Sequence, residues 1–304
     1  MQQEAACAPP LRIEPPCGDR IPAGYAAIAG FANSGKSSLL NALTGRSVSP
    51  VTPHPGTTRV PLCGLCVRPA SQICFVDMPP VESCIGLEML EWMDAAVFVA
   101  SARDFAAWSD SPDMKRFMRI FESRPVILAL SFSDYFPGRL LPALVSQASA
   151  LGDFRAAVAL CAPTGAGVAE LERKVALQMP LRTRLFPEGC YSLHSERFLI
   201  SEAVRTQLFN VLPTEIASAT AVQVEEFSFR DGKTYVRANL LVARHSGKGV
   251  IIGRKGQTLQ KITELVGIEA EKLIGRRVFL DLWVKVRESW PENRSDLLEF
   301  GYVC

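Results

Sequence analysis

The pattern of apolar positions changes once along the chain, close to residue 180. Between residues 25 and 178, short apolar runs alternate with segments whose apolar positions recur at the spacing of a helix. The runs cover residues 25–29, 72–76, 95–100, 126–130 and 156–160, and the helical segments include 37–43, 114–122 and 168–178. This alternation predicts an α/β domain with a mostly parallel sheet and helices on both faces.

The second part of the chain follows a different order of elements. We expect a helix at 196–210, strands at 221–230 and 234–244, helices at 257–265 and 268–274, and a strand at 277–286. Asp231-Gly232 separates the first two strands and is a strong signal for a two-residue hairpin turn. In the last strand every second residue from Val278 to Val286 is apolar, so one face belongs to the core and the other looks outward. These elements predict an α+β domain.

Proline and glycine mark the boundaries of these two domains. Residues 1–22 are rich in proline without any periodicity, and we expect a flexible tail there. Met179-Pro180 and the Pro187-Glu188-Gly189 stretch interrupt the pattern as a linker would. We therefore assign 23–178 to the first domain, 179–194 to the linker, and 195–304 to the second domain with its C-terminal tail.

We expect a folded, cytoplasmic protein. Its 304 residues are 48% hydrophobic and 21% charged, as expected of about two globular domains. No apolar run approaches the roughly 18–20 residues that a membrane helix needs, and prolines and acids interrupt any signal peptide. The nine cysteines are expected to be reduced thiols. Cys63 and Cys66 suggest zinc as an alternative, but residues three apart on a strand face opposite sides.

Positive charge is concentrated in one segment. The whole chain carries a net charge of +2, yet residues 244–287 contain ten Lys and Arg against four acids. Such a segment is typical of a nucleic-acid-binding module, although a solvated basic face is the simpler alternative.

The most specific motif lies at residues 30–37, GFANSGKS, which fits the phosphate-binding pattern GxxxxGK[ST] between a strand and a helix. Glycines allow successive backbone N–H groups to surround phosphates, and the helix N-terminus adds a positive end. Lys36 is expected to reach the β- and γ-phosphates, and the Ser37 hydroxyl to bind Mg²⁺.

Two further positions fit a metal beside the γ-phosphate. Asp77 directly follows an apolar strand and is expected to hold Mg²⁺, with an ordinary turn-capping aspartate as the alternative. Between the two motifs lies Pro55-Gly56-Thr57-Thr58-Arg59, where a threonine would complete the metal shell unless the segment is a plain turn.

A second motif, GRKG at residues 253–256, fits the GxxG loop with which KH modules approach single-stranded RNA. The pattern alone is weak, but an apolar segment precedes it and a helix with one apolar face follows it. The glycines permit close approach of the backbone, and the basic residues supply phosphate contacts. The residues expected to contact RNA are Lys248, Gly253, Arg254, Lys255, Gly256 and Lys261, with solvated surface lysines as the alternative for Lys248 and Lys261.

These motifs stand in an order that is similar to the Era family of bacterial GTPases, over roughly residues 24–304. The matching stretches are NSGKSS with LLNALTG, then PGTTR, VDMP, VILAL, SERFLISEAVR, LWVKV and the terminal GYV. The resemblance implies a P-loop GTPase domain followed by a type II KH domain that binds small-subunit ribosomal RNA during ribosome assembly. It also implies GTP and GDP as ligands, no stable oligomer, and peripheral association with the inner face of the cell membrane.

The resemblance assigns roles residue by residue. It implies that Lys36 and Thr58 serve catalysis and that Ser37, Thr58 and Asp77 hold Mg²⁺, while Asn33 matches an asparagine associated with K⁺. The nucleotide-binding set is Gly30, Asn33, Ser34, Gly35, Lys36, Ser37, Ser38, Asp77, Asp134, Cys161 and Ala162.

Three motifs depart from the family pattern. The last guanine motif, usually Ser-Ala, is Cys161-Ala162, and this change matters least because the main contact comes from a backbone N–H. The third GTPase motif ends in Pro80 where the family has glycine, and proline has no N–H to donate to the γ-phosphate. A hydrogen bond to a charged group contributes about 1.5–3 kcal/mol, so sensing of the γ-phosphate should weaken. The base-reading motif NKxD is Ser131-Phe132-Ser133-Asp134, in which the aspartate alone is retained. Phe132 either covers the base or is an ordinary buried aromatic.

We therefore expect a guanine-nucleotide-binding, RNA-binding assembly factor that hydrolyses GTP slowly. One rival is an RNA-binding scaffold with a vestigial nucleotide site, and another is an adenine-specific P-loop ATPase. Single-turnover GTP hydrolysis distinguishes the slow GTPase from the scaffold with a vestigial site.

Overall fold

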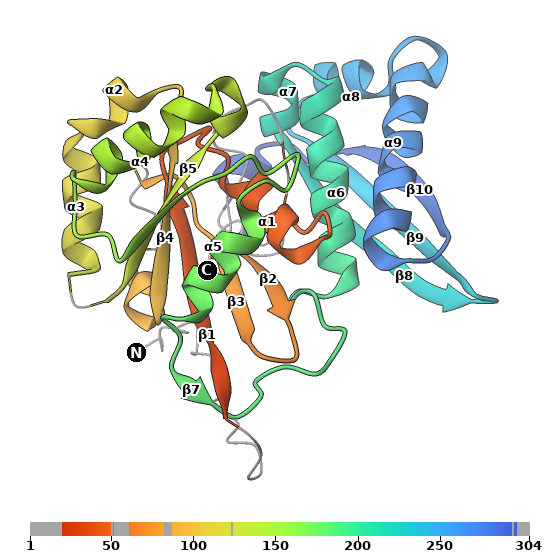
Figure 1. The fold of residues 1–304 in the computed structure, drawn as a ribbon. Helices are drawn as coiled ribbons and strands as arrows, with labels where there is room; N and C mark the ends of the chain where they lie inside the picture. Colours follow the sequence, from red (N-terminus) through yellow and green to blue (C-terminus); the bar gives the residue numbers. More distant parts are fainter. Residues whose placement is uncertain are drawn as a thin grey trace, which may run out of the picture.

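The computed structural model describes residues 20–49, 51, 61–81, 87–122, 124–293 and 295–296 of the chain. Two domains lie side by side, an α/β domain in red to green and a smaller domain in teal to blue (Figure 1). The expected catalytic and metal-binding residue Thr58 lies outside the described residues.

The N-terminal domain is built on one twisted sheet in the order β2-β3-β1-β4-β5-β6. Its strands are β1 (Ile21–Gly30), β2 (Leu62–Val67), β3 (Gln72–Asp77), β4 (Ala95–Ser101), β5 (Val126–Ser131), β6 (Ala156–Ala159) and β7 (Leu181–Arg182). All neighbours pair in parallel except β2, which is antiparallel to β3, and β7, which is antiparallel to β1. The predicted mostly parallel sheet is confirmed.

Helices cover both faces of this sheet, as the alternating pattern predicts. The helices are α1 (Lys36–Thr44) and α5 (Val168–Ala176) on one face, and α2 (Phe105–Ser109), α3 (Pro112–Ile120) and α4 (Leu141–Ser149) on the other. Each face has its own buried core, with Leu39 and Leu171 in one and Phe98 and Phe117 in the other. Because strand side chains alternate between faces, the almost wholly apolar strands fill both cores.

The C-terminal domain has a three-stranded sheet in the order β10-β9-β8, in which β9 is antiparallel to β8 and parallel to β10. Its elements are α6 (Glu196–Val211), α7 (Thr214–Ser218), β8 (Thr220–Arg230), β9 (Lys233–Val242), α8 (His245–Ile252), α9 (Gln257–Ile274) and β10 (Val278–Val286). Asp231 and Gly232 both have positive φ, 51° and 72°, as the predicted hairpin turn requires.

Three boundaries differ from the sequence prediction. The helices expected at 257–265 and 268–274 are one continuous helix, α9, because its buried face runs unbroken through Ile262, Val266 and Ala270 and outweighs the cost of Gly267. Strand β1 begins at residue 21, inside the expected tail, and residues 181–182 of the expected linker pair with it. The pairing of the first residues of β1 with β7 orders two stretches of chain that composition alone marks as irregular.

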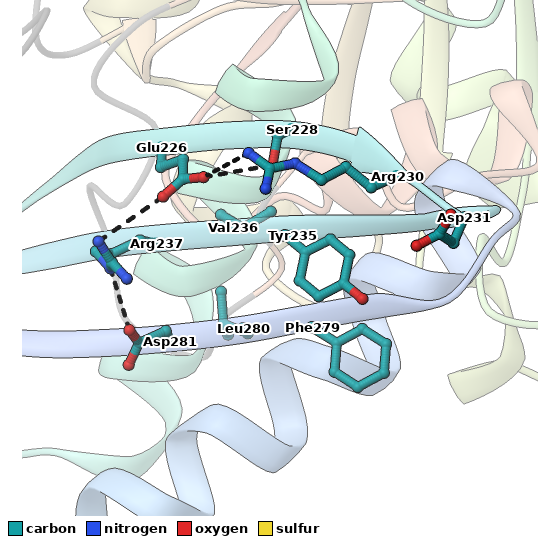
Figure 2. Close-up of a pocket in the computed structure, with 10 residues that line it drawn as sticks. All are labelled: Glu226, Ser228, Arg230, Asp231, Tyr235, Val236, Arg237, Phe279, Leu280 and Asp281. Atoms are coloured by element: carbon teal, nitrogen blue, oxygen red, sulfur yellow. Dashed lines mark hydrogen bonds and ion pairs between the residues drawn. The ribbon is translucent and has the colours of Figure 1, made fainter.

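The outer face of the C-terminal sheet carries the exposed residues that the alternation in β10 predicts. A pocket of about 460 Å³ lies on this face. The rings of Tyr235 and Phe279 lie beside each other in it (Figure 2), and their centres are 5.2 Å apart. Glu226 lies between Arg230 and Arg237, so the charges of the pocket largely neutralise one another (Figure 2).

Strand β2 separates the two cysteines that suggested zinc. Cys66 is buried on the α1 face, where its thiol contacts the Leu43 carbonyl, whereas Cys63 packs against the opposite core. Among the described residues no cluster of His, Cys, Asp and Glu is arranged to hold a metal ion. No helix in the described part of the chain is both long and apolar enough to cross a membrane.

The two domains share one apolar core and several polar contacts. The core on the α1 side of the first sheet continues into α6 and α9 of the second domain. Arg46, just after α1, donates to the Leu273 carbonyl at 2.8 Å, and Ser47 donates to Glu269 of α9 at 3.0 Å. The segment that follows α1 is therefore held against the C-terminal domain.

Candidate functional site

The loop between β1 and α1 has the geometry of a phosphate cradle. Gly30 has φ 152°, and a Cβ there would lie 2.1 Å from the Val99 carbonyl oxygen, so another residue type does not fit. Asn33 and Gly35 also adopt positive φ, 57° and 94°. This sequence of turns brings the chain from the end of β1 to the N-terminus of α1, and the N-terminal end of a helix favours an anion.

Two side chains in this loop are buried without being apolar. Lys36 is 7% exposed and donates to the carbonyls of Gly30 and Phe31, at 3.0 and 2.6 Å. Ser34 is 2% exposed, and its hydroxyl has no hydrogen-bond partner. Ser37 and Ser38 are half-buried at the start of α1, and Asn33 is exposed. Lys36 is thus held at the loop, where its ammonium group can pair with a bound phosphate.

The carboxylate of Asp77 is buried beside this loop. It ends β3, is 0% exposed, and its Oδ2 accepts hydrogen bonds from the hydroxyls of Ser37 and Ser49, both at 2.7 Å. Its Oδ1 has no hydrogen-bond partner. Desolvation by burial raises the pKa of Asp77, against the opposing attraction of Lys36 and the two hydroxyl groups.

A divalent cation suits this arrangement. A buried carboxylate with an unpartnered oxygen is a costly feature unless a cation or donor completes it. Mg²⁺ prefers oxygen ligands and usually binds through one or two protein oxygens plus phosphate. Asp77 and the hydroxyl of Ser37 are an oxygen pair of that kind, so the residues present fit the predicted metal.

Ser49 is a member of this site that sequence reasoning missed. It lies five residues after the end of α1 and bonds Asp77 through its side chain, while its N–H donates to the Asn41 side chain at 2.8 Å. No motif contains it, because the contact depends on how the chain returns from α1 toward β3. Pro80, which follows the same strand by three residues, is half-buried.

The base-reading end of the site lies at the C-terminal end of β5. The Ser131 hydroxyl donates to the Ser34 carbonyl at 2.6 Å and so ties β5 to the phosphate loop. Phe132 adopts a left-handed conformation with φ 58°, and its ring tip lies 3.8 Å from the point where a Cβ of Gly35 would stand. Asp134 follows in a short 3₁₀ turn and is exposed.

The last predicted pair follows β6. The N–H of Cys161 donates to the Ala166 carbonyl at 2.9 Å, so this backbone donor is already engaged within the protein. The structure therefore brings the ends of β1, β3, β5 and β6 to one edge of the sheet, opposite β7 in Figure 1. In parallel sheets this carboxyl edge is where ligands bind.

The second candidate site is the turn between α8 and α9. Gly253 has φ 71°, and a Cβ there would stand 2.1 Å from the Thr258 hydroxyl oxygen, so glycine is required. Gly256 has φ 80° in open space, and Arg254 and Lys255 between them are exposed. The turn presents backbone and two cations to solvent at the start of α9. Lys261 is exposed farther along α9, and Lys248 is half-buried on α8.

Two family models match the chain, one in each domain. The model described as "50S ribosome-binding GTPase" matches residues 25–131, and the model described as "KH domain" matches residues 215–291. The two matches contain the phosphate loop and the GRKG turn respectively.

Solved structures support the same architecture. An Era variant from Aquifex aeolicus bound to GDP·AlF4⁻ superposes with a TM-score of 0.83 at 28% identity, and the match covers 93% of this chain and 100% of that chain. An Era structure with MgGDPNP and nucleotides 1506–1542 of 16S ribosomal RNA also gives 0.83, at 29% identity and the same coverage.

Curated relatives match along nearly the whole chain. GTPase Era of Trichlorobacter lovleyi is 33% identical over 288 residues, which cover 92% of this chain and 97% of the relative. GTPase Era of Coxiella burnetii is 33% identical over 293 residues with the same coverage. With both domains matched in their order, the chain belongs to the Era family of GTPases.

Proposed function

We propose that this chain binds guanine nucleotides with Mg²⁺, hydrolyses GTP slowly, and binds small-subunit ribosomal RNA as an assembly factor. The observation that carries the nucleotide part is the buried Asp77, whose unpartnered oxygen stands beside the phosphate loop and is joined to it through Ser37. The relatives described above support the RNA part, since one of them is seen with 16S ribosomal RNA.

Each part of the site has a role that follows from its chemistry. The N-terminus of α1 and the loop N–H groups receive the phosphates, and Lys36 supplies a charge that neutralises them. Ser37 and Asp77 would hold Mg²⁺, which offsets the negative charge on the phosphates when bound. Asp134 accepts hydrogen bonds from the N–H donors of guanine, which adenine cannot present in the same way. Thr58 and Ser38 complete the set by family resemblance.

Slow hydrolysis follows from Pro80. Because proline lacks the N–H that the family's glycine offers to the γ-phosphate, the site loses a contact worth about 1.5–3 kcal/mol. We therefore propose that GDP and GTP bind with similar affinity and that the switch between them is weak.

Further assignments rest on the family and, for the RNA contacts, also on the GRKG motif. Asn33 is the residue that would face K⁺, and Arg254 and Lys255 with the flanking Lys248 and Lys261 are the residues that would contact RNA phosphates. We also infer a cytoplasmic protein without a stable oligomer, with the inner face of the membrane as a second location.

Titration calorimetry with GDP, ADP and a non-hydrolysable GTP analogue tests the nucleotide proposal. GDP and the GTP analogue should bind within about tenfold of each other, and ADP should bind more weakly. Lys36→Ala should weaken all three because it removes a charge partner of the phosphates. Equal affinity for ADP and GDP would favour the ATPase reading instead.

A further inference from the structure

The side chain that replaces the motif lysine is held in an unusual setting. Phe132 occupies the second position of the base-reading motif, has left-handed backbone, and is half-buried with its ring tip near Gly35. A left-handed conformation is uncommon for an aromatic residue and costs free energy, so the surrounding structure must hold it. The residues that contact Phe132 therefore determine how its ring is oriented.

Arg103 holds one face of this ring. It lies in the loop that follows β4, and its guanidinium carbon is 3.9 Å from the centre of the Phe132 ring and 4.8 Å from that of Tyr135. The two rings meet edge to face, 80° apart, with their centres at 6.2 Å. The guanidinium of Arg103 therefore contacts both aromatic rings. The contact is a cation–π interaction between Arg103, which follows β4, and two aromatic residues that follow β5.

The position of the ring points to the nucleoside. Its tip lies at the end of the phosphate loop, where α1 begins, and Asp134 stands two residues beyond it. A nucleotide whose phosphates lie at α1 and whose base reaches Asp134 must pass along this ring. Since Arg103 covers one face of Phe132, a flat base has the other face to stack on, and such stacking is favourable for any aromatic base.

We propose that Arg103 is a positioning residue for the nucleotide base. Its guanidinium packs on one face of the Phe132 ring and fixes the ring's orientation, so that the opposite face stacks on the purine. The inference rests on the proposed guanine-nucleotide site and deepens it. Stacking responds to the flat surface of the base and not to its hydrogen-bonding edge. Arg103 therefore contributes affinity for purine nucleotides in general, whereas Asp134 separately selects guanine.

Calorimetry with GDP, IDP and ADP on Arg103→Ala tests this role. Loss of the contact should lower the affinity for GDP by about 2- to 10-fold. The affinity for IDP and ADP, where wild type binds them, should fall by the same factor. Binding of inorganic tripolyphosphate, which has no base, should stay unchanged. The matched control is Arg119→Ala, because Arg119 is exposed at the end of α3, which leads to the opposite edge of the sheet. Its affinities should equal those of wild type.

A double-mutant cycle shows whether Arg103 acts through the ring. Phe132→Leu removes the aromatic ring without adding a charge, and in that background Arg103→Ala should no longer change GDP affinity. Equal GDP affinity of Arg103→Ala and wild type would overturn the inference, as would tighter binding, which would mean that the guanidinium occupies the place of the base. An equal loss of tripolyphosphate and GDP binding would show a general disturbance and overturn it too. Wild type that binds tripolyphosphate but no GDP would instead overturn the proposed function.

Discussion

Replacing Asp77 by asparagine is expected to stabilise the nucleotide-free protein while removing its response to Mg²⁺ with nucleotide. The wild-type carboxylate is completely buried, and one of its oxygens has no hydrogen-bond partner. Leaving a buried polar group unsatisfied costs about 1–3 kcal/mol, and more when the group is charged. Asparagine keeps an oxygen that the hydroxyls of Ser37 and Ser49 can reach, but it carries no charge into the interior.

The effect depends on pH in a direction that follows from the raised pKa of Asp77. The folded state binds the proton more tightly than the unfolded state does, so stability falls as pH rises from the ordinary aspartate range through the raised folded pKa. Above that pKa the loss is complete. Asp77→Asn lacks this titration. The difference in unfolding free energy between the variant and wild type should therefore grow as pH rises and then become constant.

The assay is thermal unfolding with EDTA across a pH series, followed by the same series with Mg²⁺ and GDP. At neutral pH the variant should gain about 1 kcal/mol, because removal of the buried charge is partly offset by an amide NH2 that has no partner in the place of Oδ1. Each kcal/mol shifts Tm by about 2–4 °C for a domain of this size. Saturating ligand should stabilise wild type far more than the variant. Asp153→Asn, at an exposed position, is the matched control and should behave as wild type. A variant less stable than wild type at neutral pH, or an advantage independent of pH, would refute the reasoning.

The other predictions concern the domain contact, the γ-phosphate and the RNA turn. Ser47→Ala and Glu269→Ala should show a coupling of about 1 kcal/mol in a double-mutant cycle of urea unfolding, because the two side chains share a hydrogen bond to a charged group. Additive effects would mean that the contact is absent in solution. Pro80→Gly should raise affinity for a GTP analogue relative to GDP by about tenfold or more, since it restores an N–H; an unchanged ratio in calorimetry would argue against this role. Replacing both Arg254 and Lys255 with Asp should abolish binding to single-stranded small-subunit rRNA fragments in an electrophoretic assay and leave GDP affinity intact. The wild-type salt dependence should have a log–log slope of roughly −0.7 per phosphate contacted; a mutant with the wild-type slope would place the contact elsewhere.

The sequence was sufficient for the phosphate loop because its constraints are local. Gly30 and Gly35 are required by their own backbone angles, and Lys36 follows them within a few residues. The same holds for the hairpin at Asp231 and for Gly253, whose neighbour Thr258 leaves no room for a Cβ. Motif and periodicity therefore predicted both domains and the places of both candidate sites.

Contacts between segments that are distant in the sequence could not be predicted from motifs or periodicity. Ser49 meets Asp77 across 28 residues of sequence, and Ser47 meets Glu269 across 222. Arg103 reaches Phe132 because β4 and β5 are neighbours in the sheet, which sequence order alone does not fix. Such pairs carry no spacing signal, since their meeting depends on the packing of whole elements.

Single-turnover hydrolysis of GTP with saturating Mg²⁺ and K⁺ tests the central claim most directly. The account predicts slow phosphate release that disappears in Lys36→Ala and becomes faster in Pro80→Gly. Release no greater than that of Lys36→Ala, from wild-type protein that binds GTP, would contradict the account and leave an RNA-binding scaffold with a vestigial nucleotide site.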